Sequence, residues 1–103
     1  GLMRSVACDV GLHGATANAV CPGWVRTAMA EDDARWEAEQ KGVSAEEIWR
    51  LRDAGYPRGR VLTADEVAQT ISFLASDAAE FINGAVVPVD GAVHARLSSP
   101  QID

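Results

Sequence analysis

The sequence predicts an α/β fold in which two parallel strands are flanked by helices. Two short apolar runs, residues 15–21 and 85–90, have the composition of strands, and three helical patterns lie between them. Strands that are joined through helices pair in parallel. Parallel sheets are normally buried on both faces, and two strands alone do not make a stable sheet of this kind. We therefore expect other strands, from a longer chain or from a partner, to complete the sheet.

The first predicted helix precedes the first strand and covers residues 2–10. Its apolar residues have the three- and four-residue spacing of an amphipathic helix, and they are Leu2, Met3, Val6, Ala7 and Val10. Gly11 and Gly14 predict the end of this helix. Residues 15–21 (A-T-A-N-A-V-C) then predict a mostly buried strand. It stops at Pro22-Gly23, because proline cannot continue a central ladder.

Two helices are predicted in the middle of the chain. Residues 27–40 have a helical pattern, which Gly42 interrupts. Ser44-x-x-Glu47 is a capping box, and it begins a second helix that reaches about residue 53.

The same region is strongly charged. Residues 31–53 contain eight acidic and four basic residues, which is typical of a solvated helix surface. Trp36 and Trp49 lie at helical spacing from other apolar residues, so we expect both to pack against a neighbouring helix.

A loop and then a third helix follow, still between the two predicted strands. Gly55, Pro57 and Gly59 predict the loop, and Thr63-x-x-Glu66 is a second capping box. The helix that it begins has an apolar stripe of Val67, Ala68, Ile71, Leu74 and Ala75.

The last predicted strand lies near the end of the chain. Asn83-Gly84 predicts a turn, and residues 85–90 (A-V-V-P-V-D) predict a short apolar strand. Residues 92–103 have the composition of a mobile tail.

Composition excludes several classes of protein. The chain has 103 residues, enough for one small domain, and a net charge of −6 argues against binding to nucleic acid or to an anionic membrane surface. No apolar run approaches the roughly 18 residues of a membrane-spanning helix. Two cysteines and two histidines, at no metal-ligand spacing, predict a reduced cytoplasmic protein without a metal site.

Residues 22–27 (P-G-W-V-R-T) are the most informative segment for function. A strand that ends in Pro22-Gly23 places the next backbone groups at the carboxyl edge of a sheet, where open α/β folds bind ligands. Gly23 allows close approach of the main chain, and Thr27 offers a hydroxyl where a helix N-terminus favours a phosphate or amide oxygen. A plain turn followed by a helix cap would explain the same residues.

The order of several motifs resembles the short-chain dehydrogenase/reductase family. Residues 18–27 (N-A-V-C-P-G-W-V-R-T) closely resemble the N-x-V-x-P-G-x-V-x-T segment of that family. The segments that follow in the family's order are Gly59-Arg60, residues 65–68 (D-E-V-A), residues 73–77 (F-L-A-S-D), residues 82–84 (I-N-G) and residues 89–91 (V-D-G). The resemblance is strongest to 3-oxoacyl-carrier-protein reductases and hydroxybutyrate dehydrogenases.

The resemblance implies a fold and a cofactor. Residues 1–103 would form the C-terminal part of one NAD(P)-binding, Rossmann-type doubly wound sheet, with residues 28–58 as the substrate loop. The family binds NAD or NADP, exchanges a ketone and a secondary alcohol by hydride transfer, and forms homotetramers. In such a tetramer, residues 1–10 and 63–89 would lie at the interface.

The resemblance also implies roles for individual residues. The main chain of Val25 would bind the nicotinamide carboxamide, and Thr27 would add a side-chain hydrogen bond to the carboxamide or the pyrophosphate. Pro22 and Gly23 would shape the bend beneath the ring. Trp24 and Met29 would border the substrate.

The catalytic residues of the family do not occur in this chain. Its glycine-rich phosphate loop, catalytic Ser and Tyr-x-x-x-Lys are absent, so we assign no catalytic residue and expect the chain alone to be inactive. The resemblance places Tyr-x-x-x-Lys just ahead of Gly1. Tyr56 is predicted to be a loop residue at the opening of the substrate site, because Pro57 and two flanking glycines place Tyr56 and Arg60 on a loop.

Two other interpretations remain open at this stage. The chain could be a non-catalytic relative that binds a dehydrogenase-like partner and completes its sheet. It could also be a small helical binding module, which would fold cooperatively by itself. The choice between NAD and NADP depends on residues near the adenine ribose, and this segment does not contain them.

Overall fold

A computed structural model describes residues 1–95 and confirms the predicted order of helices and strands. The elements are α1 (Leu2–Gly11), β1 (Ala19–Pro22), α2 (Ala28–Lys41), α3 (Ala45–Ala54), α4 (Ala64–Leu74), the 3-10 helix η1 (Asp77–Ala79), β2 (Val86–Val89) and the 3-10 helix η2 (Val93–Ala95). Residues 93–95 of the predicted tail form η2, and its residues 96–103 lie outside the described part.

The two strands pair in parallel, as predicted. Ala19 lies opposite Val86 and Pro22 opposite Val89. The N–H groups of Ala19 and Gly23 donate to Ala85 and Val89, at 2.9 and 3.1 Å. Because successive N–H groups of a strand point to opposite sides, the nitrogen of Pro22 faces away from β2 and no ladder bond is lost. The strand therefore includes Pro22, where the sequence predicted its end.

The first strand also begins later than predicted, at Ala19 instead of residue 15. Before β1, the side chains of two asparagines take the place of main-chain hydrogen bonds between the strands. Asn18 accepts from Ala85 N and donates to Ile82 O, both at 2.9 Å. Asn83 accepts from Ala17 N and donates to Ala7 O, also at 2.9 Å. This pair of amides connects α1 to the sheet and sets the register of the two strands.

Side-chain caps begin three of the helices. Thr27 accepts from Ala30 N at the start of α2, and α4 has the complete predicted capping box of Thr63 and Glu66. Ser44 caps α3 by accepting from Glu47 N, but the second half of that predicted box does not form. The Glu47 carboxylate binds Arg50 instead.

The core of the described chain lies between α2, α3 and residues 56–62, and not in the sheet. The buried residues of this core are Ala30, Ala34, Ala38, Ile48, Trp49, Tyr56, Val61 and Leu62. Alanines at every fourth position of α2 let α3 approach closely. Trp49 is 3% exposed, as predicted, whereas Trp36 is 64% exposed and the prediction for it is wrong. Trp36 lies on the other side of α2 from these alanines.

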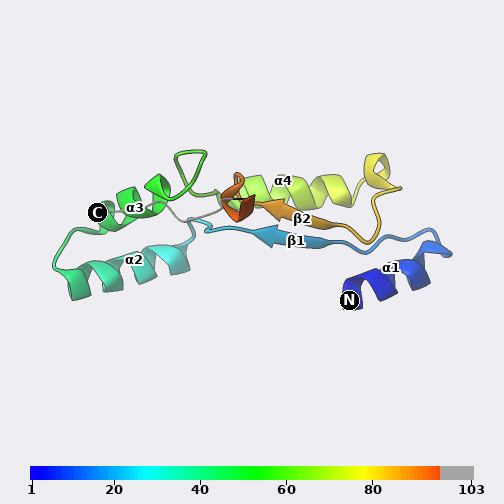
Figure 1. Cartoon of the computed structure of the whole chain (residues 1–103), viewed down its shortest axis with the longest axis horizontal. Helices are drawn as coiled ribbons and strands as arrows, with labels where there is room; N and C mark the ends of the chain where they lie inside the picture. The colour runs from blue at the N-terminus through cyan, green and yellow to red at the C-terminus, as the bar shows by residue number, and fades with distance from the viewer. Residues whose placement is uncertain (96–103) are drawn as a thin grey trace.

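Within the described residues, apolar side chains of the sheet and of α4 remain exposed. Figure 1 shows the α2–α3 pair at one end of the elongated molecule and α1 at the other, with the sheet and α4 between them. Val86 of β2 is 60% exposed, and the α4 stripe leaves Ile71 52% exposed. The apolar strands thus lack the burial that a parallel sheet normally has.

Candidate functional site

A short irregular segment, residues 23–26 (the bend), connects β1 to α2 at the carboxyl edge of the sheet. Gly23 lies very close to side chains beneath it. A Cβ at this position would be 2.5 Å from Tyr56 Oη and 3.0 Å from Asp90 Cβ. The sequence predicted that Gly23 allows close approach of a ligand, but the approach seen here is to the protein's own core.

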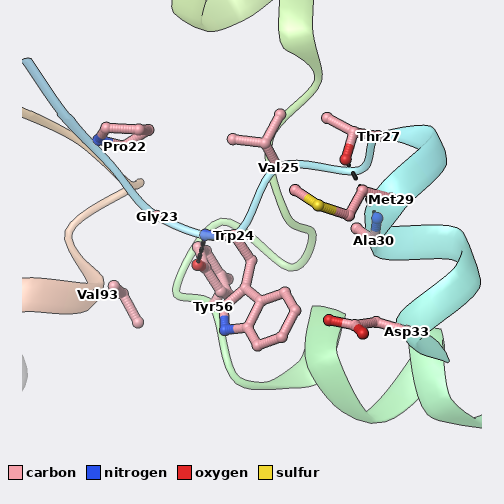
Figure 2. A pocket seen from close by; sticks show the side chains of 10 residues that line it. All are labelled: Pro22, Gly23, Trp24, Val25, Thr27, Met29, Ala30, Asp33, Tyr56 and Val93. Atoms are coloured by element: carbon pink, nitrogen blue, oxygen red, sulfur yellow. Dashed lines mark hydrogen bonds between the residues drawn. The ribbon is translucent and has the colours of Figure 1, made fainter. Parts of the chain in front are cut away.

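Tyr56 supports the bend from below. It follows α3, is 7% exposed, and its hydroxyl oxygen accepts a hydrogen bond from Trp24 N. The sequence predicted a loop residue at the opening of the site. Tyr56 does lie in a loop and lines the pocket, but its hydroxyl binds the main chain (Figure 2).

Val25 forms an isolated parallel bridge with Leu62. Leu62 N donates to Trp24 O at 3.0 Å, and Arg26 N donates to Leu62 O at 2.9 Å. Both bonds use the groups that flank Val25. Within residues 1–95, the N–H and C=O of Val25 itself have no hydrogen-bond partner. The bend therefore presents one free donor and one free acceptor.

Thr27 lies at the start of α2, two residues after Val25. Its Oγ1 accepts from Ala30 N at 3.2 Å. A hydroxyl group also carries one donor hydrogen, and the cap leaves that hydrogen available. The first turn of α2 favours a negatively charged or polar acceptor at the same place.

A pocket of about 600 Å³ opens beside the bend. Figure 2 shows Trp24, Met29, Thr27 and Asp33 around it. The complete lining consists of Pro22, Gly23, Trp24, Val25, Thr27, Met29, Ala30, Asp33, Tyr56 and Val93. All six residues that the sequence predicted for the cofactor and substrate line this one pocket. Trp24 is 47% and Met29 78% exposed, so the pocket has an open, apolar side.

Stacked side chains hold Trp24 in place. The Arg52 guanidinium lies 4.2 Å from the centre of the Trp24 ring and 4.9 Å from that of Trp49. Arg26 covers Trp49 at 4.4 Å. Hydrogen bonds from Arg26 and from Trp49 to the Glu31 carboxylate lower its pKa below the usual value. These contacts join the wall of the pocket to α3.

Asp90 fixes the turn of residues 90–94, which lies on the opposite side of the bend. Its buried carboxylate accepts from Ala92 N and His94 N, both at 3.1 Å. Burial raises the pKa of Asp90, but the hydrogen bonds from His94 and Ala92 outweigh it and the pKa is lowered. The resulting turn places Val93 against the pocket.

Three residues in or beside this site were not predicted from the sequence: Asp33, Arg52 and Asp90. For Asp33 a signal was present. Asp33 lies four residues after Met29, which the family resemblance placed beside the substrate, and residues at this spacing share one side of a helix. For Arg52 and Asp90, the contacts depend on elements distant in the sequence, and no local pattern indicates them.

The described residues contain no group of three or more His, Cys, Asp or Glu that could hold a metal ion. Cys8 and Cys21 are free and exposed. None of the helices over residues 1–95 is long and apolar enough to cross a bilayer.

Comparison with known proteins gives consistent matches over nearly the whole chain. Residues 1–94 match the family model described as enoyl-(acyl carrier protein) reductase. D-beta-hydroxybutyrate dehydrogenase of Cupriavidus necator is 35% identical over 92 residues, which are 88% of this chain and 36% of that protein. 3-Oxoacyl-[acyl-carrier-protein] reductase FabG of Pseudomonas aeruginosa is 35% identical over 94 residues, which are 91% of this chain and 34% of that protein.

A solved structure agrees with these matches. A short chain dehydrogenase family protein from Francisella tularensis superposes with a TM-score of 0.88 and 29% identity, over 92% of this chain and 39% of that one. The chain spans about a third of the length of the two relatives above.

Proposed function

This chain belongs to the short-chain dehydrogenase/reductase family, and we propose that the protein containing it interconverts a ketone and a secondary alcohol by hydride transfer. Its fold is that of part of a Rossmann-type sheet. In this proposal residues 1–103 are the C-terminal part of a single domain, which binds NAD or NADP. They supply the nicotinamide-side loop and the substrate wall, while the catalytic acid/base lies elsewhere in the complete protein.

The free peptide groups of Val25 carry the proposal. A carboxamide has one C=O acceptor and an NH2 donor, and Val25 offers one N–H and one C=O that no other described group uses. Two such bonds would fix which face of the nicotinamide ring is presented. When bound, the nicotinamide supplies or accepts the hydride.

Other residues of the pocket would complete the binding site. Thr27 would donate its free hydroxyl hydrogen to the carboxamide or the pyrophosphate. Trp24 and Met29 would cover the substrate and exclude water, with α2 and α3 acting as the substrate lid. Pro22 and Gly23 shape the bend that brings these groups together.

The remaining parts of the proposal concern the whole protein. We expect a cytoplasmic homotetramer with α1 and residues 63–89 at its interfaces, and no activity from residues 1–103 alone. Exposed apolar side chains on these elements support an interface. They are Leu2 (81% exposed), Val6 (36%), Ile71 (52%), Phe73 (49%) and Val86 (60%).

Substitution of Thr27 in the complete gene product tests cofactor binding. Thr27→Ser and Thr27→Asp both keep the helix cap, but only serine keeps a hydroxyl donor. We expect Thr27→Asp to raise the KM for the nicotinamide cofactor by at least about 3- to 10-fold, because it loses one neutral hydrogen bond and adds a negative charge beside the cofactor, and Thr27→Ser to leave it near wild type. An equal KM in both variants would remove Thr27 from the proposed site.

A second candidate function is favoured by the open strands. The strand edges of the two-stranded sheet that stay unpaired within residues 1–95 would suit a non-catalytic relative that completes the sheet of a dehydrogenase-like partner. The complete gene product distinguishes the two, because an enzyme oxidises NADH or NADPH in the presence of ketones. Absence of turnover with a panel of ketones, together with formation of a stable complex with a partner dehydrogenase, would favour the second candidate.

A further inference from the structure

Arg52 of α3 lies behind the Trp24 wall of the pocket. Its guanidinium lies over two indole rings, 4.2 Å from the centre of the Trp24 ring and 4.9 Å from that of Trp49. Trp24 lines the pocket, whereas Arg52 is not among the described residues that line it. The guanidinium therefore covers one face of the Trp24 ring, and the pocket adjoins the rest of the indole.

The hydrogen bonds of Arg52 do not account for its burial. Its side chain is 13% exposed, and Nη2 donates to Glu37 at 3.1 Å. Nη1 is buried and has no hydrogen-bond partner within residues 1–95. The Glu37 carboxylate does not depend on Arg52 alone, because Lys41 also binds it, at 2.9 Å. A buried polar group without a partner costs free energy, and stacking on the two rings is the interaction that offsets this cost.

The second ring of the stack is itself fixed in the core. Trp49 is 3% exposed, its Nε1 donates to Glu31 at 2.8 Å, and Arg26 covers its ring at 4.4 Å. Trp24 is 47% exposed. Arg52 thus connects a half-exposed ring of the pocket wall to a buried and anchored one.

The residues around the Trp24 wall are mostly apolar (Figure 2). The apolar side chains that line the pocket with Trp24 include Pro22, Val25, Met29 and Val93. An indole that is already held in one orientation favours a flat apolar group beside it, because aromatic rings stack and little side-chain freedom is lost on binding. A small aliphatic ketone has no ring to stack, so it gains less from such a wall.

We propose that Arg52 is a positioning residue that sets the substrate class of the site: by fixing the Trp24 indole, it favours ketones that carry a planar apolar group such as a phenyl ring. This inference rests on the proposed hydride-transfer function. Arg52 acts only through Trp24 and does not contact the substrate.

Two ketones that differ by a phenyl group test the inference in the complete gene product. Benzylacetone is butanone with an added phenyl group, so the carbonyl that reacts is the same. The kcat/KM of each is measured with NADH and with NADPH, and the ratio of the two values gives the preference. We expect wild type to prefer benzylacetone. The preference should fall about 2- to 12-fold in Arg52→Met and in Arg52→Lys, the value of one aromatic contact, because neither side chain has a planar group to stack on the ring.

The two variants and a control separate stacking from charge. Arg52→Lys keeps a positive charge beside Glu37, so a preference that falls only in Arg52→Met would overturn the role of stacking. Arg50→Met is the matched control, since Arg50 lies on the same helix and pairs with Glu47. It should leave the preference within about twofold of wild type, as for other surface substitutions.

A double variant tests whether Arg52 acts through Trp24. In a Trp24→Ala background, Arg52→Met should have no further effect on the preference, because the ring that it positions is gone. A general structural effect of Arg52→Met would persist in that background and would overturn the inference.

Fluorine NMR of the protein labelled with fluorotryptophan follows the indole without turnover. The Trp24 resonance is assigned by its loss in Trp24→Phe, and we expect it to shift in Arg52→Met and to stay in place in Arg50→Met. An unchanged Trp24 resonance in Arg52→Met, or a wild-type preference for butanone, would overturn the inference and leave the proposed function standing. Turnover of other ketones but of neither of these two would do the same. Absence of turnover of every ketone tested would overturn both.

Discussion

A methyl group at Gly23 tests whether the bend rests on Tyr56. The Cβ of Gly23→Ala would lie 2.5 Å from Tyr56 Oη, 3.0 Å from Asp90 Cβ and 3.1 Å from Tyr56 Cε2. Overpacking of this kind costs about 1–3 kcal/mol. In a protein of 150–250 residues each kcal/mol shifts the Tm by about 2–4 °C, so thermal unfolding of the complete gene product should show a loss of about 2–12 °C.

Removal of the tyrosine hydroxyl should relieve part of that cost. Tyr56→Phe alone loses the hydrogen bond accepted from Trp24 N, about 0.5–1.5 kcal/mol. In the double variant the 2.5 Å contact no longer exists, so the two losses should fall short of additivity by about 1 kcal/mol. Gly11→Ala serves as the control, because alanine is favoured in a helix and Asn83 Nδ2 at 3.3 Å is the only neighbour within 4 Å. Additive losses, or an unchanged Tm in Gly23→Ala, would refute the assigned packing of the bend.

Two further predictions concern stability. Trp49→Ala should lower the free energy of unfolding in urea by about 3–5 kcal/mol, because the Trp49 ring is buried and stacked. Trp36 is exposed, so Trp36→Ala should change stability by less than about 0.5 kcal/mol. Similar losses in the two variants would contradict the position of the core. Hydrogen bonds from Arg60 and Thr63 lower the pKa of Glu66 to about 2. The resulting stabilisation is complete above the usual glutamate pKa of 4.5 and is lost as the pH falls toward about 2. Urea unfolding should therefore show wild type losing its advantage over Glu66→Gln on acidification. A difference that stays constant between pH 6 and pH 2.5 would contradict this linkage.

Features that depend on near neighbours in the sequence could be predicted. The three side-chain caps at Thr27, Ser44 and Thr63 each need a backbone N–H three residues later, and all three form. The segment from Pro22 to Thr27 was also placed correctly at the carboxyl edge of a parallel pair. The conformation of such segments depends on residues that are close in sequence, so the residue pattern is sufficient to predict it.

Features that depend on distant residues could not be predicted in the same way. Trp36 and Trp49 have equivalent helical patterns, and only the approach of α3 to the alanine side of α2 decides which ring is buried. The Asn18 and Asn83 amides replace a ladder across more than sixty positions. The proline and glycines that flank Tyr56 predict a loop residue at the opening of the substrate site. Nothing in the sequence indicates that Trp24 N lies within hydrogen-bond distance of its hydroxyl.

The bend is held at three points, and this determines what it can bind. Gly23 is bonded to β2, Trp24 to Tyr56 and Leu62, and Arg26 to Leu62. Each bond fixes a peptide group on one side of Val25, so the free N–H and C=O of that residue have a set direction before any ligand arrives. Groups that are already oriented lose little conformational freedom on binding. All three anchors come from this chain, so the orientation of Val25 does not depend on which further strands complete the sheet.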